Sequence, residues 1–377
     1  LARQRINATP HMSTSYVTST ATMNAAYLTA HGGNEVVCVG HRPRPVRRHG
    51  EVLVRLEAAT LNRVDLYMRD SGAGITHSLP QIMGIDGAGV VEEVDANEHG
   101  LSVGQRVTLY PGLTCGRCEF CRRGEPVLCT SMRLLGEHRD GTLAQYVSLP
   151  AANAFALPDS LGYAEGAALG VNHLTAWRML FTKARLQPGE TVLVFGVGGG
   201  VSLAALQLAK AAGARVIVTS RDADKLARAM ALGADATIDT SAEDAARRVM
   251  ALTDGRGVDV VIENIGAAVW TTALKCLVRG GRIVTCGATT GDQPPADLRR
   301  VFIRQLQIFG STLGNPDEFG ALLAWCAQGR VHPLIDRRYP LAEVHAALTY
   351  LESGRQFGKI AVMIGDADQP GCAADTP

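Results

Sequence analysis

From Glu190 onward, the chain alternates short apolar runs with amphipathic stretches. The runs TVLVFG, ARVIVTS and VDVVIEN are expected to be strands, and their continuously apolar parts, such as VLVF and VVI, are typical of strands that are buried on both faces. The stretches between them, such as 201–212 and 224–232, have the spacing of amphipathic helices. Strands that alternate with helices predict a doubly wound parallel α/β sheet, which we place over residues 166–311.

The pattern differs before about residue 155. Short strands such as EVLVRLEAA, GAGVVEEVD and QRVTLY are separated by Gly, Pro and Asp, which predicts a β-rich partial barrel over residues 23–165. The last apolar run, GKIAVMIG, is expected to return to this barrel, so that 312–365 belongs to it. Residues 1–22 and 366–377 lack any apolar period and are predicted to be disordered extensions.

Composition narrows the function classes. A chain of 377 residues with 46% apolar residues has the size and composition of two globular domains. The net charge of +1 provides no basic field for nucleic acid, and no apolar run reaches the ~18 residues of a membrane span. Nine cysteines, an odd number with four close together, favour a cytoplasmic metal site over disulfides.

The clustered cysteines have metal-ligand spacing. Cys115, Cys118, Cys121 and Cys129 form C-x2-C-x2-C-x7-C within a lobe at 111–130. Four thiolates fill the tetrahedral corners of a zinc ion and leave no open position, so we expect one structural zinc. The alternatives are an iron–sulfur cluster and four unrelated thiols.

A glycine cluster follows the strand TVLVFG. Gly196, Gly198, Gly199 and Gly200 precede a helix that starts near Val201. Such a turn brings backbone amides and a helix N-terminus against a pyrophosphate, and the alternative is a merely flexible turn.

The end of the second strand bears on the choice of cofactor. Ser220 and Arg221, with Lys225 one turn further on, favour the 2′-phosphate of NADPH over NADH. Asp222 and Asp224 count against this preference, but they lie past the strand end.

Together these features resemble the medium-chain dehydrogenase/reductase superfamily, over about Met23 to Gly365. The resemblance implies a Rossmann domain, a GroES-like β-rich domain, a small-molecule substrate and a homodimer or homotetramer. It also implies that four residues at helix and strand ends face the nicotinamide: Thr175, Asn264, Cys286 and Gly287.

Within that family, the members with a catalytic zinc have a cysteine at the position of Asn62 and a His-Glu pair at Ile85 and Asp86. Their third ligand falls at Val171, or at Asn172 if the alignment slips. Ile and Val cannot ligate zinc, so the resemblance implies that the catalytic metal has been lost.

The segment from Asn62 to Tyr67 resembles the N-x-x-D-x-Y motif of the zinc-free quinone oxidoreductases and enoyl reductases. Ser202 departs from that branch, which usually has a last glycine there, and the cysteine lobe departs from most quinone oxidoreductases.

These residues predict an NADPH-dependent reductase of an activated C=C bond in an enone, quinone or enoyl-thioester. Asn62 is expected to donate to the enolate oxygen, and Tyr67 to supply a proton, orient the substrate or pack beside the cofactor. Asp65 is expected to make a structural hydrogen bond or an ion pair with Arg69, and His173 to line the site. The alternatives are a metal-independent carbonyl or alcohol oxidoreductase and a non-catalytic NADPH-binding protein.

Overall fold

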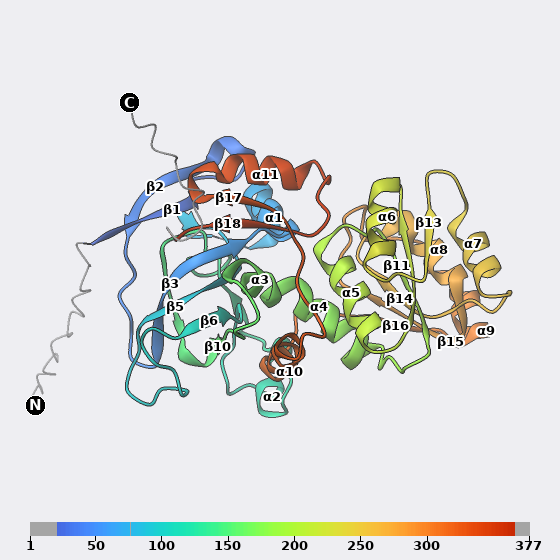
Figure 1. The fold of residues 1–377 in the computed structure, drawn as a ribbon, viewed down its shortest axis with the longest axis horizontal. Coiled ribbons are helices and arrows are strands. Elements are labelled where there is room, and N and C mark those ends of the chain that lie inside the picture. Colours follow the sequence, from blue (N-terminus) through green and yellow to red (C-terminus); the bar gives the residue numbers. More distant parts are fainter. Residues whose placement is uncertain (1–20, 76, 366–377) are drawn as a thin grey trace, which may run out of the picture.

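Two large β-sheets organise the protein, one in each half (Figure 1). The structure is a computed structural model that describes residues 21–75 and 77–365. The extension predicted for 1–22 overlaps these residues only at its end, where Thr22 already begins strand β1. The tail predicted for 366–377 lies outside the described residues.

The sheet of the second half is parallel and six-stranded, with the order β13-β12-β11-β14-β15-β16. This order confirms the predicted doubly wound fold, because successive strands move outward on both sides of β11. The strands are β11 (Thr191–Val194), β12 (Arg215–Ser220), β13 (Ala236–Asp239), β14 (Val258–Glu263), β15 (Leu277–Thr285) and β16 (Gln307–Gly310). The connecting helices are α5 (Gly200–Ala211), α6 (Ala223–Ala231), α7 (Ala245–Leu252), α8 (Ala267–Cys276) and α9 (Leu298–Arg304).

The sheet of the first half has the order β10-β6-β5-β3-β18-β17, and β9 also pairs with β3. Its strands are β3 (Glu51–Thr60), β5 (Asp86–Glu93), β6 (Arg106–Leu109), β9 (Tyr146–Pro150), β10 (Ala154–Ala156), β17 (Ile335–Pro340) and β18 (Lys359–Met363). Smaller sheets contain β1 (Thr22–Leu28), β2 (Val37–Pro43), β4 (Gln81–Ile82), β7 (Gly112–Leu113) and β8 (Arg133–Leu134). The last strand, β18, pairs antiparallel with β3, which brings the C-terminal segment back to the first half.

The remaining helices belong to the first half or join it to the second. They are α1 (Arg63–Ser71), α2 (Glu119–Arg122), α3 (Tyr163–Ala167), α4 (Leu174–Trp177), α10 (Pro316–Ala327) and α11 (Val344–Glu352). Short 3-10 turns occupy 34–36, 72–74, 126–128, 151–153 and 341–343. No helix among the described residues is long and apolar enough to cross a membrane.

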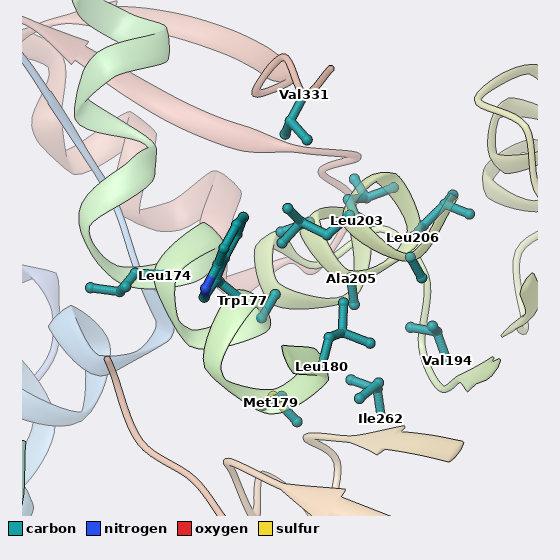
Figure 2. Close-up of a cluster of buried hydrophobic side chains, with 14 of the residues drawn as sticks. Leu174, Trp177, Met179, Leu180, Val194, Leu203, Ala205, Leu206, Ile262 and Val331 are labelled. Atoms are coloured by element: carbon teal, nitrogen blue, oxygen red, sulfur yellow. The ribbon is translucent and has the colours of Figure 1, made fainter. Parts of the chain in front are cut away.

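The connection between the halves is helical, and the sequence pattern did not predict it. It includes π-helical segments at Leu169–His173 and Arg178–Lys183 on either side of α4. Figure 2 shows Trp177 and Leu180 of this connection beside Leu203 of α5. They belong to a buried apolar cluster that also contains Tyr110 of the first half, so one core extends across both halves.

A buried arginine reinforces the same connection. Arg178 is 1% exposed, and its guanidinium pairs with Glu125 beside the cysteine lobe at 2.7 Å and with Glu318 of α10 at 2.9 Å. A buried charge is stable only when it is paired and hydrogen-bonded. Arg178 therefore fixes the cysteine lobe and α10 against the connecting helices.

Candidate functional site

The four cysteines of the lobe converge, as their spacing predicted. All four Sγ atoms lie within 4.8 Å of one another, with 3.5 Å between Cys118 and Cys121 and 4.0 Å between Cys115 and Cys121. Four sulfurs around zinc at 2.3 Å lie about 3.8 Å apart, so the lobe has the dimensions of a tetrahedral zinc site. Backbone N–H groups of Cys115 and Ser131 donate to the sulfur of Cys129 at 3.3 Å and 3.4 Å.

The lobe is separate from the candidate active site and closed by four protein sulfurs. Within 21–75 and 77–365, it is the only group of three or more His, Cys, Asp or Glu residues close enough to share one metal ion. The residues therefore fit a zinc ion that stabilises the lobe, and they leave it no open position for a substrate.

The glycine loop lies between β11 and α5, and a side chain would clash at two of its positions. Gly198 has a φ of 124°, and a Cβ there would lie 2.8 Å from the Lys225 side chain. At Gly200 a Cβ would lie 2.0 Å from Asn172 Oδ1. The N-cap of α5 is Gly199, so no side chain blocks the helix N-terminus, and the loop fits a pyrophosphate group.

The tip of β12 has the arrangement that the sequence suggested. Ser220 is buried, and its hydroxyl accepts from the Asp222 N–H at 3.1 Å, whereas Arg221 is exposed. The Asp222 carboxylate caps α6 by accepting from the N–H groups of Asp224 and Lys225. Both of these bonds go to Oδ1 of Asp222, which lies past the end of β12. The Lys225 ammonium donates to the carbonyl of Gly354 at 2.5 Å.

Residues expected beside the nicotinamide lie at the neighbouring strand and helix ends. Thr175 is buried in α4, Val201 is half-buried at the start of α5, and a Cβ on Gly287 would lie 3.1 Å from the carbonyl of Asn264. Burial raises the pKa of the Cys286 thiol to about 12, so Cys286 is a neutral wall residue rather than a nucleophile.

Ser202, which departs from the reductase pattern, fits without strain among these residues. It is 1% exposed, its hydroxyl donates to the carbonyl of Phe195 at 3.0 Å, and it accepts from Asn264 at 3.4 Å.

Asn62, Asp86 and Asn172, which lie at or beside the positions expected for catalytic-zinc ligands, form a buried hydrogen-bond network with Lys359, which the sequence analysis did not single out. The Lys359 ammonium donates to Asn62 Oδ1 at 2.6 Å, to Asn172 Oδ1 at 2.8 Å and to Asp86 Oδ2 at 3.1 Å. Burial lowers the pKa of Lys359, and the Asp86 carboxylate opposes that shift. The only sequence signal was a lysine at the start of an otherwise apolar strand.

This network changes the role expected of Asn62. Its side-chain amide donates to Asp86 Oδ2 at 2.9 Å and to the carbonyl of Thr60 at 3.4 Å, while its oxygen accepts from Lys359. Asn62 is 3% exposed and has no amide hydrogen left for a substrate. The expected donation to an enolate oxygen is therefore not supported, and Asn62 is a positioning residue in this geometry.

Tyr67 and Asp65 lie on α1, which begins after Asn62. Tyr67 is 40% exposed, and partial burial raises the pKa of its hydroxyl. Asp65 is buried and accepts from the Asn62 backbone N–H at 2.6 Å, which is the structural hydrogen bond that was expected. The alternative of an ion pair with Arg69 is wrong, because Arg69 pairs with Asp70 and Glu352 at 2.5 Å each.

His173 has a packing role in this structure. It is 3% exposed, and its Nδ1 lies 3.1 Å from the carbonyl of Ala168 within the same helical connection. Burial lowers its pKa to about 4, so the ring is neutral at physiological pH. A substrate contact by His173 is not supported by this burial.

Glu137 is a buried carboxyl group that the sequence analysis missed. It is 5% exposed in the loop between β8 and β9, and its Oε2 is 4.0 Å from Nδ1 of His138. Burial raises its pKa to about 7. The sequence signal was weak, because Glu137 stands among the polar residues of LGEHRDG.

We predict one equivalent of zinc per chain, measured by elemental analysis of purified protein. Cys118→Ser should reduce the zinc content and lower the melting temperature, because it removes one of four ligands. Cys38→Ser, a half-buried cysteine in β2, is the control and should retain full zinc. Two equivalents in the wild type, or full zinc in Cys118→Ser, would contradict this interpretation of the lobe.

We predict that Glu137 makes stability pH-dependent. Because the pKa of Glu137 is raised in the folded state, its contribution to the free energy of unfolding is complete below pH 4.5 and is lost as the pH rises through 7. The free energy of unfolding of Glu137→Gln, taken relative to that of the wild type, should therefore increase from pH 5 to pH 8 by up to about 3 kcal/mol. Urea unfolding at both pH values checks this, with the exposed Glu343→Gln as control. If the free energy of unfolding changes equally with pH in the wild type and in Glu137→Gln, this prediction is wrong.

Comparison with known proteins agrees with this geometry. Residues 48–159 match the alcohol dehydrogenase GroES-like domain, and residues 200–328 match the zinc-binding dehydrogenase family. A NAD-dependent alcohol dehydrogenase of Sulfurisphaera tokodaii is 32% identical over 327 residues, which cover 84% of this chain and 93% of the relative. A zinc-type alcohol dehydrogenase-like protein of Schizosaccharomyces pombe is 34% identical over 325 residues, 84% of this chain and 91% of that protein.

Solved structures show the same similarity. A NAD-dependent alcohol dehydrogenase superposes with a TM-score of 0.88 at 41% identity, over 91% of this chain and all of that one (100%). A crotonyl-CoA carboxylase/reductase superposes with a TM-score of 0.85 at 29% identity, over 91% of this chain and 88% of that one. The protein is therefore an oxidoreductase, and the chain belongs to the medium-chain dehydrogenase/reductase superfamily.

Proposed function

We propose that this enzyme reduces a C=C bond conjugated to a carbonyl, as in an enone, quinone or enoyl-thioester. One observation carries the proposal. The positions of the catalytic zinc ligands hold Asn62, Ile85 and Val171, and Asn62 is hydrogen-bonded to Lys359. Ile and Val offer no lone pair, so the residues present do not fit a catalytic metal ion.

The missing ligands bear on the reaction because alcohols are poor hydride donors until they lose a proton. A zinc ion with an open position normally promotes that loss by lowering the pKa of the bound group. A conjugated alkene has no such requirement, because its own carbonyl takes up the developing negative charge. A reduced nicotinamide bound at the glycine loop would supply the hydride.

The remaining task is to deliver a proton and to orient the alkene. Tyr67 is suited to this, because it lies on α1, the helix capped by Asn62 of the buried network, and it is 40% exposed. A positioned acid of this kind typically contributes 10²–10⁴-fold to the rate. We assign this role to Tyr67, with solvent as the rival proton source.

A metal-independent carbonyl or alcohol oxidoreductase is the second candidate. It is favoured by the relatives named NAD-dependent alcohol dehydrogenases, whereas the crotonyl-CoA carboxylase/reductase favours alkene reduction. A third possibility, from a different class, is a protein that binds NADPH and turns over nothing.

We predict measurable reduction of enones, quinones or enoyl-thioesters and little oxidation of simple alcohols. On the best alkene, Tyr67→Phe should lower kcat by about 10² or more while cofactor binding stays unchanged. Tyr27→Phe, in strand β1, is the matched control and should keep wild-type kcat. The measurement is NADPH consumption over a panel of alkenes, ketones and alcohols.

Each class of substrate in that panel separates one candidate from the others. Strong alcohol oxidation or ketone reduction without alkene reduction would favour the second candidate. Cofactor binding without any turnover would favour the non-catalytic protein. Full activity of Tyr67→Phe on the best alkene would remove Tyr67 from the mechanism.

We also propose a preference for NADPH over NADH. The proposal is supported by Ser220 at the end of β12, with Asp222 lying beyond the strand end as the cap of α6, and by the exposed Arg221 at the tip of β12. An arginine can pair with a 2′-phosphate through two charge-assisted hydrogen bonds. The names of the relatives point the other way, because two of them are called NAD-dependent.

The test is the double variant Ser220→Asp, Arg221→Ala. We expect its KM for NADPH to rise roughly tenfold or more, because one charged hydrogen-bonding partner is lost and a like charge is added. Arg215→Ala, at the opposite end of β12, is the control and should not change the preference. Equal use of NADH and NADPH by the wild type would refute the preference.

We further propose that the protein is a dimer formed through β16. This strand is one of the two edge strands of the parallel sheet, and apolar side chains are exposed on it and on α9, namely Leu298, Phe302, Ile303 and Ile308. An exposed edge with an apolar patch is suited to pair with its own copy across a two-fold axis.

We predict that Phe302→Glu yields monomers at micromolar concentration in light scattering, because Phe302 is 68% exposed in this patch. Met230→Glu, at another exposed apolar side chain on α6, should leave the wild-type state unchanged. A wild type that is already monomeric, or an unaffected Phe302→Glu, would contradict the proposed interface.

A further inference from the structure

Arginine side chains gather around an open cavity in the half of the protein that contains the parallel sheet. The cavity has a volume of about 620 Å³. Its walls come from the segments before β11 and β14, from the start of β15, from the end of α9 and from the start of β16. The charged side chains that line it are four arginines and two carboxylates, namely Arg256, Arg279, Arg282, Arg304, Glu190 and Asp259.

This cavity and the glycine loop lie at opposite ends of the same strands. The strands of the sheet are parallel, so the segments that precede β11, β14 and β16 meet at one edge. The glycine loop follows the carboxyl end of β11 and lies at the other edge. None of the described residues that line the cavity is among those expected to contact the cofactor or the substrate. A ligand bound here would occupy a second site, apart from the candidate active site.

Two of the four guanidinium groups are paired with the two carboxylates. Arg256 contacts both carboxylate oxygens of Asp259, at 2.7 Å and 3.0 Å, and Arg282 pairs with Glu190. The side chains of Asp259 and Glu190 are only 12% and 22% exposed, so each carboxylate is held close to its arginine. These four charges therefore neutralise one another.

The other two guanidinium groups are held in place but are not neutralised. Within residues 21–75 and 77–365, Arg279 and Arg304 have no carboxylate partner. Each donates from one nitrogen, Nη1, to a backbone carbonyl: Arg279 to Ile303 at 3.2 Å and Arg304 to Leu277 at 2.9 Å. A carbonyl orients a guanidinium group and leaves its positive charge unchanged. Two like charges are thus fixed at one cavity, where they repel each other unless an anion enters.

We propose that this cavity binds the phosphate group of a small phosphate monoester. Such a group has a charge of about −1.5 to −2 at pH 7, which matches the two unpaired guanidinium charges. Arginine binds phosphate oxygens through pairs of parallel N–H bonds. In Arg279 and Arg304, the Nε and Nη2 atoms make no hydrogen bond within the described part of the chain, so both are available for such pairs.

The size of the cavity indicates that the ligand is larger than a phosphate ion. A volume of about 620 Å³ lies within the range of small-molecule sites. The carboxylates of Glu190 and Asp259 and the amide of Gln307 also line it, so its walls are polar. The part of the ligand beyond the phosphate is therefore a polar group.

The first experiment measures binding without any turnover. In isothermal titration calorimetry, methyl phosphate should bind the wild-type protein with a dissociation constant of about 1 mM or lower. Dimethyl phosphate has one negative charge and one more methyl group. We expect it to bind at least about tenfold more weakly at equal ionic strength, because a charge-assisted hydrogen bond is lost.

The second experiment assigns the binding to the cavity. The double variant Arg279→Gln, Arg304→Gln removes both unpaired charges and should weaken the binding of methyl phosphate about tenfold or more. Arg299→Gln is the matched control, because Arg299 is an exposed arginine of α9 outside the cavity, and it should bind as the wild type does. Arg221→Ala, at the position expected to bind the 2′-phosphate of the cofactor, should bind equally well.

A single variant keeps the test valid if the double variant does not fold. Arg279 is exposed, so Arg279→Gln should fold and should weaken the binding of methyl phosphate about threefold or more. Unchanged binding in the folded double variant, or in Arg279→Gln if only that one folds, would overturn the proposed site.

The remaining outcomes are equally decisive. Equal binding of methyl phosphate and dimethyl phosphate, or equal weakening by Arg299→Gln, would show a general attraction of anions to the surface and would overturn the site. Loss of binding in Arg221→Ala alone would place the phosphate at the cofactor loop, with the same consequence. A wild type that binds no methyl phosphate would refute the proposal directly. These measurements do not use the reaction, so failure of the proposed function leaves them unaffected.

Discussion

The pairing of a buried ammonium with a buried carboxylate, Lys359 with Asp86, is the constraint on which the candidate site depends. Either charge alone would be strongly unfavourable in a region that excludes water, so each residue requires the other. Asn62 and Asn172 complete the hydrogen bonding of the ammonium. Since the four residues come from four separate elements, this interaction also determines how those elements meet.

The path of the chain explains why such an interaction is found at this place. The chain passes into the parallel sheet through the helical connection around α4 and returns through α10 to β18, beside β3 (Figure 1). The first residue of β18 therefore lies beside both the glycine loop and the positions of the zinc ligands. Arg178, paired with Glu125 and Glu318, holds the same helical connection from the side of the cysteine lobe. The two halves are thus joined by polar contacts on both sides of one apolar core.

Local patterns were sufficient to predict the sheets and the cysteine lobe. Strands such as β11 and β14 are buried along their whole length because both faces are covered, and their apolar residues indicate this. The four cysteines are close in sequence, so spacing alone brings them together. The helical connection was missed because LGVNHLTAW lacks clear caps and contains π-helical turns, whose period differs from 3.6. Lys359 was missed because its partners Asn62 and Asp86 are 297 and 273 residues away, and only the tertiary fold brings them together.

A buried ion pair and a metal ion suit different reactions. A zinc ion with an open position binds an oxygen directly and changes its pKa, which is what oxidation of an alcohol requires. An ammonium whose three hydrogens are already donated, one of them to the Asp86 carboxylate, belongs to an ion pair without net charge and cannot bind a substrate oxygen. Such a pair cannot acidify an alcohol as a zinc ion does, so it suits a substrate that accommodates developing negative charge on its own atoms. A conjugated carbonyl develops that charge on receiving hydride, and its proton then has to come from a separate group at the surface of the site. In the function proposed above, Tyr67, which is 40% exposed, is the candidate for supplying this proton, and the Lys359–Asp86 pair keeps the buried polar residues of the site paired.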